Sequence, residues 1–480
     1  MSGDDQLARG AVLTEAAVQE LGAALRGIMI LPGNDAYEAT RRVWNGIIDK
    51  RPALIVQCAG VADVIAAVQF ARDHDLLVAV RGGAHNVAGN AVCDGGMVID
   101  LSRMKSVRVD PSARTARAEP GLTWGEFDRE TQAFGLATTG GLVSTTGIAG
   151  FTLGGGVGWL VRKFGTTSDN LLSADVVTAD GRSVTASGKE NADLFWGVRG
   201  GGGNFGVVTS FEYGLHPVGP MVMGGAVFHP AAKAKELLRF YRDFAARAPE
   251  ELTTLFVFLT APPAPFIPKQ LHGTPMVVVA CCYAGSLEDA APVVQPLKEF
   301  GPPAIDLIGP MPYRVLQTMF DGSAPAGLQN YWKSQYLKDL SDDTIDVLAD
   351  RTRDLPSPLT AVHIHHLQGA VARVGEDDTA FGHRGSPFIL NLVSMWTDPA
   401  ESEKQVRWTR EFHTVMQPFS DGGVYVNFLG EEGEDRVRAA YGASKYRRLV
   451  DLKDKYDPTN FFRMNQNIRP SSEAARRKAA

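Results

Sequence analysis

Clusters of glycine constrain this chain more than any other feature of its sequence. The first is RGGAHNVAGNA at residues 81–91, where His85 stands among small side chains. Because glycine lacks a Cβ and tolerates positive φ, backbone N–H groups in such a loop can approach a polyanion. Taken alone, the loop fits a tight turn with a surface histidine equally well. Further clusters at residues 140–158 and 199–206 favour the binding interpretation.

Length, charge and cysteine content narrow the class of protein. The 480 residues exceed the roughly 250–300 at which a single core stops growing, so we expect two domains. A net charge of −6 without a basic run argues against nucleic acid or an anionic membrane surface as a partner. Four cysteines without CxxC spacing indicate buried thiols in a reducing compartment, not disulfides or a zinc site.

Two segments bear on targeting, and neither indicates a membrane protein. The opening residues MSGDDQLARG are acidic and lack an apolar signal-peptide core, so we expect a cytoplasmic protein. Residues 140–161 are apolar and long enough to suggest a membrane span, but their many glycines would make a poor helix. Buried glycine-rich turns are the better interpretation.

The spacing of apolar residues predicts an α+β fold. Strand-like residues 53–57 and 76–80 flank a helix over 61–75, which gives a β-α-β unit. Short strands follow, with a hairpin at Asp180-Gly181. From about residue 217 to 420, amphipathic helices alternate with β-rich runs, which predicts an antiparallel sheet covered by helices on one face.

Four ordered segments resemble the berberine bridge enzyme-like branch of the vanillyl-alcohol-oxidase flavoprotein superfamily. They are RGGAHNVAG at 81–89, TTGIAGFTLGGGVGWLVRKFGTTSDN at 145–170, DLFWGVRGGGGNFGVVT at 193–209 and YDPTNFFRMNQNI at 456–468, with RVGEDDTAFGHR at 373–384 between the last two. The resemblance implies a PCMH-type FAD-binding domain of two small α/β subdomains at 1–215. It also implies a substrate-binding domain at 216–425 and a C-terminal return to the first domain at 426–480.

The same resemblance implies FAD as cofactor, bound covalently through His85 only. An imidazole nitrogen can attack the 8α carbon of the flavin. The cysteine that makes a second link in many relatives falls on Val143, which has no nucleophile. The cofactor contacts implied are Arg81, Gly82, Gly83, Ala84, Asn86, Val87, Gly89, Val143, Thr146, Gly147, Gly150, Gly154, Gly155, Gly158, Val208, Tyr425, Asn427, Asn465 and Gln466. For Asn465 a plain turn beyond a C-terminal helix explains the sequence equally well.

The candidate catalytic residues are Tyr425, Asn427 and Lys333. Alternation in residues 424–428 predicts a strand with Tyr425 and Asn427 on one face, and relatives place such a pair over the flavin. Tyr425 is then the candidate base, and its pKa of about 10 requires a nearby cation, for which Lys333 is the candidate. Without the resemblance, a half-buried strand tyrosine is the simpler interpretation.

The expected function is an FAD-dependent oxidase. It would transfer a hydride from a CH–OH or CH–N carbon of a small molecule to the flavin and pass the electrons to dioxygen. Thr146 departs from the apolar residue that relatives carry near the oxygen path, which leaves a dehydrogenase open. A carbohydrate oxidase, or a flavin-holding protein without turnover, also fits the same sequence.

Two further patterns compete with a flavin site. The run GGGVG at 154–158 suggests an NAD site, but the GxGxxG phase and the placement near the N-terminus are not all present. His363, His365 and His366 suggest a metal, but no carboxylate or cysteine accompanies them at ligand spacing, so we expect none. The oligomeric state expected is a monomer or homodimer.

Overall fold

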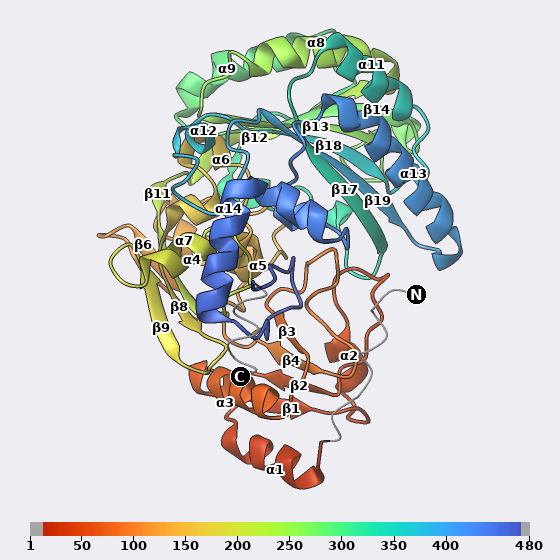
Figure 1. Ribbon diagram of the computed structural model, residues 1–480. Coiled ribbons are helices and arrows are strands. Elements are labelled where there is room, and N and C mark those ends of the chain that lie inside the picture. Colours follow the sequence, from red (N-terminus) through yellow and green to blue (C-terminus); the bar gives the residue numbers. More distant parts are fainter. Residues whose placement is uncertain (1–12, 472–480) are drawn as a thin grey trace.

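The computed structural model describes residues 13–471 and consists of two β-rich halves joined by a long helix (Figure 1). The first half contains two small sheets, and the second is built on one large sheet. This arrangement confirms the predicted α+β class. No helix within residues 13–471 is both long and apolar enough to cross a bilayer.

The first sheet contains the predicted β-α-β unit. Its strands run in the order β1-β2-β4-β3, and β4 pairs in parallel with both β2 and β3. Helix α3 packs its apolar side on the sheet through Val64, Ala67, Val68 and Ala71. The elements are α1 (Glu15–Ala24), β1 (Ile28–Ile30), α2 (Tyr37–Arg41), β2 (Leu54–Gln57), α3 (Val61–Asp73), β3 (Val78–Arg81) and β4 (Met97–Asp100).

The second sheet is antiparallel, in the order β5-β6-β10-β8-β9. Helix α4 begins at Trp124, after a reciprocal capping box formed by Thr123 and Glu126. Residues 140–164 form turns and short helices, as their glycine content predicts. The elements are β5 (Val107–Asp110), β6 (Thr115–Ala118), α4 (Trp124–Gln132), β7 (Leu136–Ala137), α5 (Ile148–Leu153), α6 (Val161–Phe164), η1 (Thr167–Asn170), β8 (Leu171–Val177), β9 (Ser183–Ser187), α7 (Ala192–Val198), β10 (Val207–Gly214) and β11 (His216–Pro217).

The large sheet is antiparallel throughout and runs β15-β12-β14-β13-β18-β19-β17, with β16 also on β12. Its strands are β12 (Met221–Pro230), β13 (Leu252–Thr260), β14 (Pro275–Tyr283), β15 (Ile305–Asp306), β16 (Gly309–Pro312), β17 (Gln329–Leu337), β18 (Ala361–His366) and β19 (Phe388–Trp396). The helices of this half are α8 (Ala234–Ala245), α9 (Leu287–Glu299), α10 (Tyr313–Leu316), α11 (Asp342–Arg351), α12 (Ala370–Arg373) and α13 (Ser402–Met416), with 3-10 turns at Ala231–Lys233, Lys269–Leu271, Asp321–Ser323, Pro399–Glu401 and Gln417–Phe419.

Helices α8, α9, α11 and α13 cover one face of this sheet, as expected (Figure 1). Alternate strand residues such as Val362, Ile364, Leu390 and Leu392 pack against them. The intervening residues point to the opposite face, which lies toward the first half of the molecule. None of α8, α9, α11 and α13 lies on this second surface, which the short helices α6 and α10 contact, and we call it the helix-free face.

The last helix, α14 (Glu434–Tyr456), runs between the two halves, with a break at Gly442, where φ is 74° (Figure 1). Beyond it, the chain binds the third glycine cluster: Asn204 accepts a hydrogen bond from the Ile468 amide at 2.9 Å. Lys453 and Asp457 form a fully buried ion pair of 2.7 Å. Lys453 also donates to the carbonyls of Asn204 and Phe462, so this pair fastens the end of the chain to the first half.

Asp457→Asn should destabilise the protein by about 3–5 kcal/mol, because it leaves the buried Lys453 ammonium without a counter-charge. Urea unfolding followed by tryptophan fluorescence measures the change. Asp451→Asn, at an exposed position of the same helix, is the matched control and should leave the midpoint unchanged. Equal midpoints for the two variants would show that the Lys453–Asp457 pair does not stabilise the folded protein.

Candidate active site

The loop after β3 presents a row of backbone amides that the protein itself does not use. Among residues 13–471, no acceptor takes a hydrogen bond from the amides of residues 82–86. Ala84 has a φ of 58°, so the chain turns there and gathers successive N–H groups on one side. A dinucleotide diphosphate, with its several anionic oxygens, fits such a concave set of donors.

The glycines of this loop act differently from what the sequence suggests. Gly82 and Gly83 do not adopt positive φ, whereas Gly89 does, at 73°. Gly83 is required by contact: a Cβ on it would lie 2.4 Å from the amide nitrogen of Gly147, and a Cβ on Gly147 would lie 2.4 Å from that of Gly83. The main chains of the two glycine-rich segments therefore touch.

His85 lies partly buried beside this contact. Its ring stacks on Trp44 with centroids 5.2 Å apart, and its Nε2 lies 3.1 Å from the Thr145 hydroxyl. Burial lowers the pKa of His85 to about 4, so the imidazole is neutral at neutral pH. In the neutral tautomer whose Nε2–H donates to the Thr145 oxygen, Nδ1 is the nitrogen with the free lone pair.

Three other predicted cofactor contacts, Arg81, Asn86 and Val87, form hydrogen bonds within the protein. Arg81 donates to the carbonyls of Thr40 and Arg42, so it holds the segment after α2 and is not free for a phosphate. The Asn86 side chain accepts from the Asn90 amide, and the Val87 carbonyl accepts from Asn45. These bonds fix the shape of the loop.

In the second glycine cluster, the glycines predicted as cofactor contacts differ in what an added side chain would meet. A Cβ on Gly150 would meet nothing within 4 Å. Gly154, Gly155 and Gly158 instead accommodate Asn427, Phe381 and the Gly140 carbonyl, with contacts of 2.0, 2.4 and 1.7 Å for an added Cβ. These three residues must be glycine because protein atoms fill the space of a side chain, and the contact of their main chain with a cofactor stays a prediction.

Tyr425 and Asn427 meet, but not on a strand. Residues 426–428 form a 3-10 turn, η7 (Val426–Phe428), so the predicted strand is wrong. The turn brings the Asn427 amide to donate to the Tyr425 hydroxyl at 2.8 Å, and the Gly156 amide donates to the same oxygen at 3.0 Å. Burial raises the pKa of Tyr425 to about 12, against the lowering effect of these donors.

Lys333 lies on the wrong face of the sheet to assist Tyr425. Its ammonium pairs with Glu432 at 2.5 Å, and Glu432 also accepts from Arg436. Neighbouring strand residues alternate in direction, so Lys333 shares the helix-covered side with Leu337, and Tyr336 shares a cluster with Tyr425. The predicted contact of Lys333 with Tyr425 is therefore wrong.

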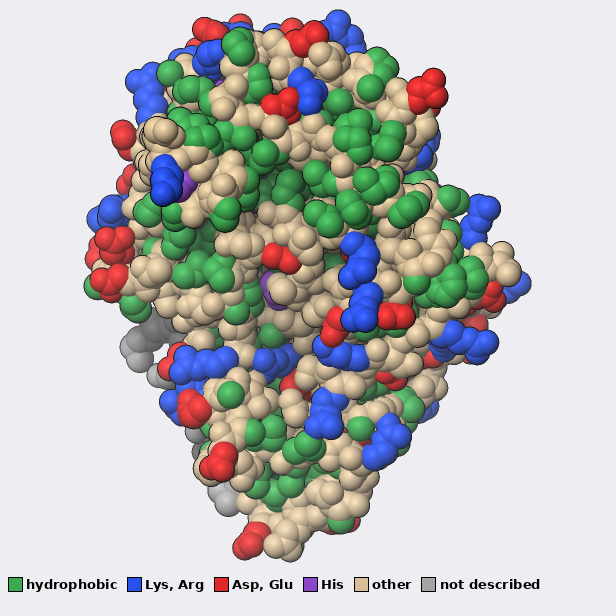
Figure 2. All heavy atoms as spheres, turned by 180° about the vertical axis from the view of Figure 1, so that it is seen from behind, with side chains coloured by type: hydrophobic (Ala, Val, Ile, Leu, Met, Phe, Trp, Pro, Cys, Tyr) green, Lys and Arg blue, Asp and Glu red, His purple; other side chains and the backbone are tan. Residues whose placement is uncertain are grey.

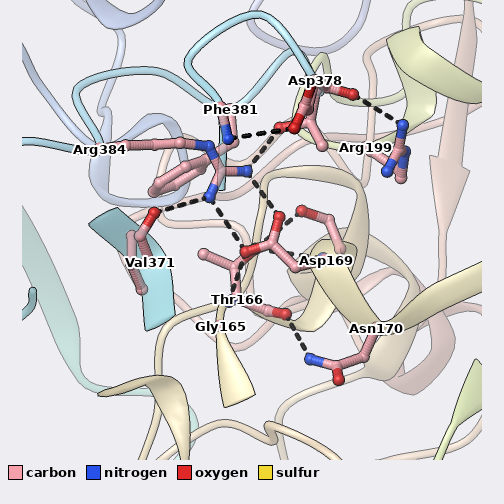
Figure 3. A network of polar contacts seen from close by, with 12 residues as sticks. Gly165, Thr166, Asp169, Asn170, Arg199, Val371, Asp378, Phe381 and Arg384 are labelled. Atoms are coloured by element: carbon pink, nitrogen blue, oxygen red, sulfur yellow. Dashed lines mark hydrogen bonds and ion pairs between the residues drawn. The ribbon is translucent and has the colours of Figure 1, made fainter. Parts of the chain in front are cut away.

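A buried ion pair holds the glycine-rich segments in place (Figure 3). Arg384 binds both carboxylate oxygens of Asp169, at 2.6 and 3.0 Å, and donates to Thr379 and the Val371 carbonyl. Asp169 in turn accepts from the Thr166 amide. The pair joins residues 154–170 to 370–384, although the sequence predicts neither residue as part of the site.

The remaining predicted contacts also bind protein atoms. Asn465 donates to the carbonyls of Gly203 and Phe462, and Gln466 donates to those of Leu429 and Gly430. Val208 is a core residue of β10. Val143 and Thr146 lie half-buried in the turn before α5, where the Thr146 carbonyl accepts from the Trp124 amide.

The three histidines of β18 do not form a metal site. No group of three potential ligands is gathered anywhere in residues 13–471. His366 lies on the helix-covered side, with Nε2 at 2.7 Å from Arg162 and Nδ1 at 3.2 Å from Thr254. His363 and His365 share the opposite, helix-free face, as strand alternation predicts.

Comparisons with known proteins identify the family of this chain. Residues 52–187 match the family described as FAD binding domain, and residues 424–469 match the one described as berberine and berberine like. An FAD-linked oxidoreductase of Dictyostelium discoideum is 34% identical over 94% of this chain and 97% of its own. The (R)-6-hydroxynicotine oxidase of Paenarthrobacter nicotinovorans is 30% identical over 93% and 97%.

The fold of a solved relative is also similar. The crystal structure of 6-hydroxy-D-nicotine oxidase from Arthrobacter nicotinovorans superposes with a TM-score of 0.83 at 28% identity, covering 93% of this chain and 98% of the other. This chain belongs to the berberine bridge enzyme-like family of FAD-linked oxidoreductases. The fold class and the family resemblance inferred from the sequence are thereby confirmed.

Gly83→Ala should cost at least about 1–3 kcal/mol of stability and lower the FAD bound per chain, because its Cβ would collide with the Gly147 backbone. Urea unfolding and the ratio of flavin to protein absorbance measure the two effects. Gly188→Ala is the control, since a Cβ there meets nothing within 4 Å. A Gly83→Ala protein as stable and as yellow as the control would contradict the contact.

Proposed function

We propose that this protein is an oxidase that holds FAD covalently through His85 alone and oxidises a CH–OH or CH–N carbon of a small molecule. The observation that carries the proposal is the row of unused amides at residues 82–86 next to His85. Anionic oxygens of the diphosphate would take those amides, which places the flavin end of the cofactor toward the histidine and Tyr425. Bound FAD would accept a hydride and pass two electrons to dioxygen, giving hydrogen peroxide.

The protein's own groups would manage the proton. The substrate loses a hydride from carbon and a proton from oxygen or nitrogen, so its single bond becomes a double bond. Tyr425 would receive that proton as phenolate, because the Asn427 and Gly156 donors stabilise negative charge on its oxygen. Since burial holds the pKa of Tyr425 at about 12, the phenolate is a minor form at neutral pH.

Covalent attachment can be tested without turnover. Acid-precipitated wild-type protein should stay yellow, and His85→Ala should release its flavin to the supernatant. His74→Ala, a histidine of the first half stacked on Phe70, is the control and should keep the colour. Because Thr145 engages Nε2, the flavopeptide should carry the bond on Nδ1, which NMR of the isolated peptide determines. Flavin that stays attached to His85→Ala would refute the attachment point.

The role of Tyr425 predicts a pH dependence. As pH rises toward 10, the phenolate fraction of a group with a pKa of about 12 grows tenfold per unit, so flavin reduction by substrate should accelerate in the same proportion. Tyr425→Phe should lower that rate by about 10²–10⁴-fold and flatten the profile. Anaerobic stopped-flow measurement of flavin bleaching tests both. A Phe variant with the wild-type rate and slope would remove Tyr425 from the mechanism.

A further inference from the structure

The helix-free face of the large sheet carries polar atoms that the protein leaves unsatisfied. His365 is 7% exposed and Asn391 1% exposed, yet Nε2 of the first and Oδ1 of the second have no hydrogen-bond partner within the described residues. Buried polar atoms are normally paired, and an unpaired one costs stability. Two such atoms on neighbouring strands therefore point to a ligand that pairs with them.

The strand register places these residues together. His363 lies directly opposite Asn391, and Asn391 lies opposite Ser334, so the three form one row across β18, β19 and β17. His365 is two residues from His363 on the same face, with ring centroids 5.8 Å apart. His366 of the same strand differs from His365, because both of its ring nitrogens already have hydrogen-bond partners.

This row lies next to the candidate base. The His365 ring is 5.4 Å from that of Phe428, and Phe428 is 4.8 Å from Tyr425. Trp332 contacts Phe428 edge-on at 5.8 Å. His365 also borders a small cavity whose opposite wall is Val157, Gly158 and Trp159 of the second glycine cluster. A molecule reacting at Tyr425 would thus meet these side chains.

The charge of this surface restricts what it can bind. On the helix-free face of β13, β18, β19 and β17, the register places no Lys, Arg, Asp or Glu among the described residues. The polar side chains on that face are those of Thr253, Asn330, Trp332, Ser334, Tyr336, His363, His365 and Asn391. Burial lowers the pKa of His363 to about 4 and that of His365 to about 3, so both imidazoles are neutral at neutral pH. Burying a charged substrate group here would leave it without a counter-ion.

We propose that His365 and Asn391, supported by His363, select the substrate of this oxidase: an uncharged, planar, largely apolar alcohol with a hydroxyl or N–H group that pairs with them. The aromatic side chains Trp332 and Phe428, which meet edge to face, give the ring apolar surface to pack on. A sugar would place several of its hydroxyl groups against the apolar side chains Val257, Ile389 and Val393 of the same face, and a protonated amine would bring a positive charge. The inference rests on the proposed function and narrows it to CH–OH oxidation.

The test is a matched set of probes on the purified holoprotein. The probes are 4-hydroxybenzyl alcohol, the cationic 4-hydroxybenzylamine, the anionic 4-(hydroxymethyl)benzoate and D-glucose, all at about neutral pH. Binding is read by the shift of the flavin absorbance spectrum under anaerobic conditions, and turnover by flavin bleaching. We expect 4-hydroxybenzyl alcohol to bind at least about 10-fold more tightly than any of the other three.

Substitutions of His365 and Asn391 test whether these two residues cause the preference for the uncharged alcohol. His365→Phe and Asn391→Leu keep shape and remove the hydrogen bond, and each should weaken binding of the alcohol about 10–100-fold. His74→Phe is the matched control and should bind as the wild type. If His365→Phe does not yield folded flavoprotein, Asn391→Leu carries the same test. Unchanged affinity in a folded variant, or tighter binding of glucose, amine or benzoate, would overturn the inference.

The two proposals fail in different ways. If one of the other probes bleaches the flavin and the alcohol does not bind, the protein is an oxidase and the inference about His365 and Asn391 is wrong. If the alcohol binds as expected but no probe bleaches the flavin, with dioxygen absent, the selection is correct and the proposed oxidation fails. The spectral shift and the bleaching are separate signals of the same flavin.

Discussion

The contact between Gly83 and Gly147 is the constraint on which the rest of the site depends. Only a missing side chain on both residues lets the two main chains approach as they do. The contact places Thr145 beside the ring of His85, and the amides of residues 82–86 next to it have no acceptor among the described residues. Any larger residue at either position would separate the loop of residues 81–89 from the segment that leads to α5.

Ion pairs elsewhere in the molecule hold separate segments of the chain together. Arg384 with Asp169 and Lys453 with Asp457 are buried pairs that tie distant segments together, and Lys333 with Glu432 holds β17 against the start of α14. The surface seen in Figure 2 mixes Lys and Arg with Asp and Glu and shows no continuous basic patch, in keeping with the overall charge of −6. The helix-free face of β13, β17, β18 and β19, by contrast, carries no charged side chain among the described strand residues.

Local sequence patterns predict the elements of this fold well and the contacts of the site less well. The capping box at Thr123 and the hairpin at Asp180-Gly181 are recognisable because their chemistry lies within a few residues. The contacts of Trp44 and Thr145 with His85 are not predicted from the sequence. No motif in the residues around either one indicates this role, and only folding brings them to the imidazole ring. The role predicted for Lys333 is wrong, although the sequence contains the information needed to avoid the error. Side chains alternate along a strand, so Lys333 must point to the opposite face from Trp332 and Ser334.

The bond between Asn204 and Ile468 spans 264 residues of chain. The glycine cluster at 199–206 is therefore completed by residues that leave the ribosome only after the whole large sheet has been synthesised. Contacts so far apart in sequence form slowly, because a long loop must close before they stabilise anything. The first half therefore acquires its contacts with residues 453–468 only late in synthesis, and truncation of the final segment would remove the partner of the Asn204 side chain.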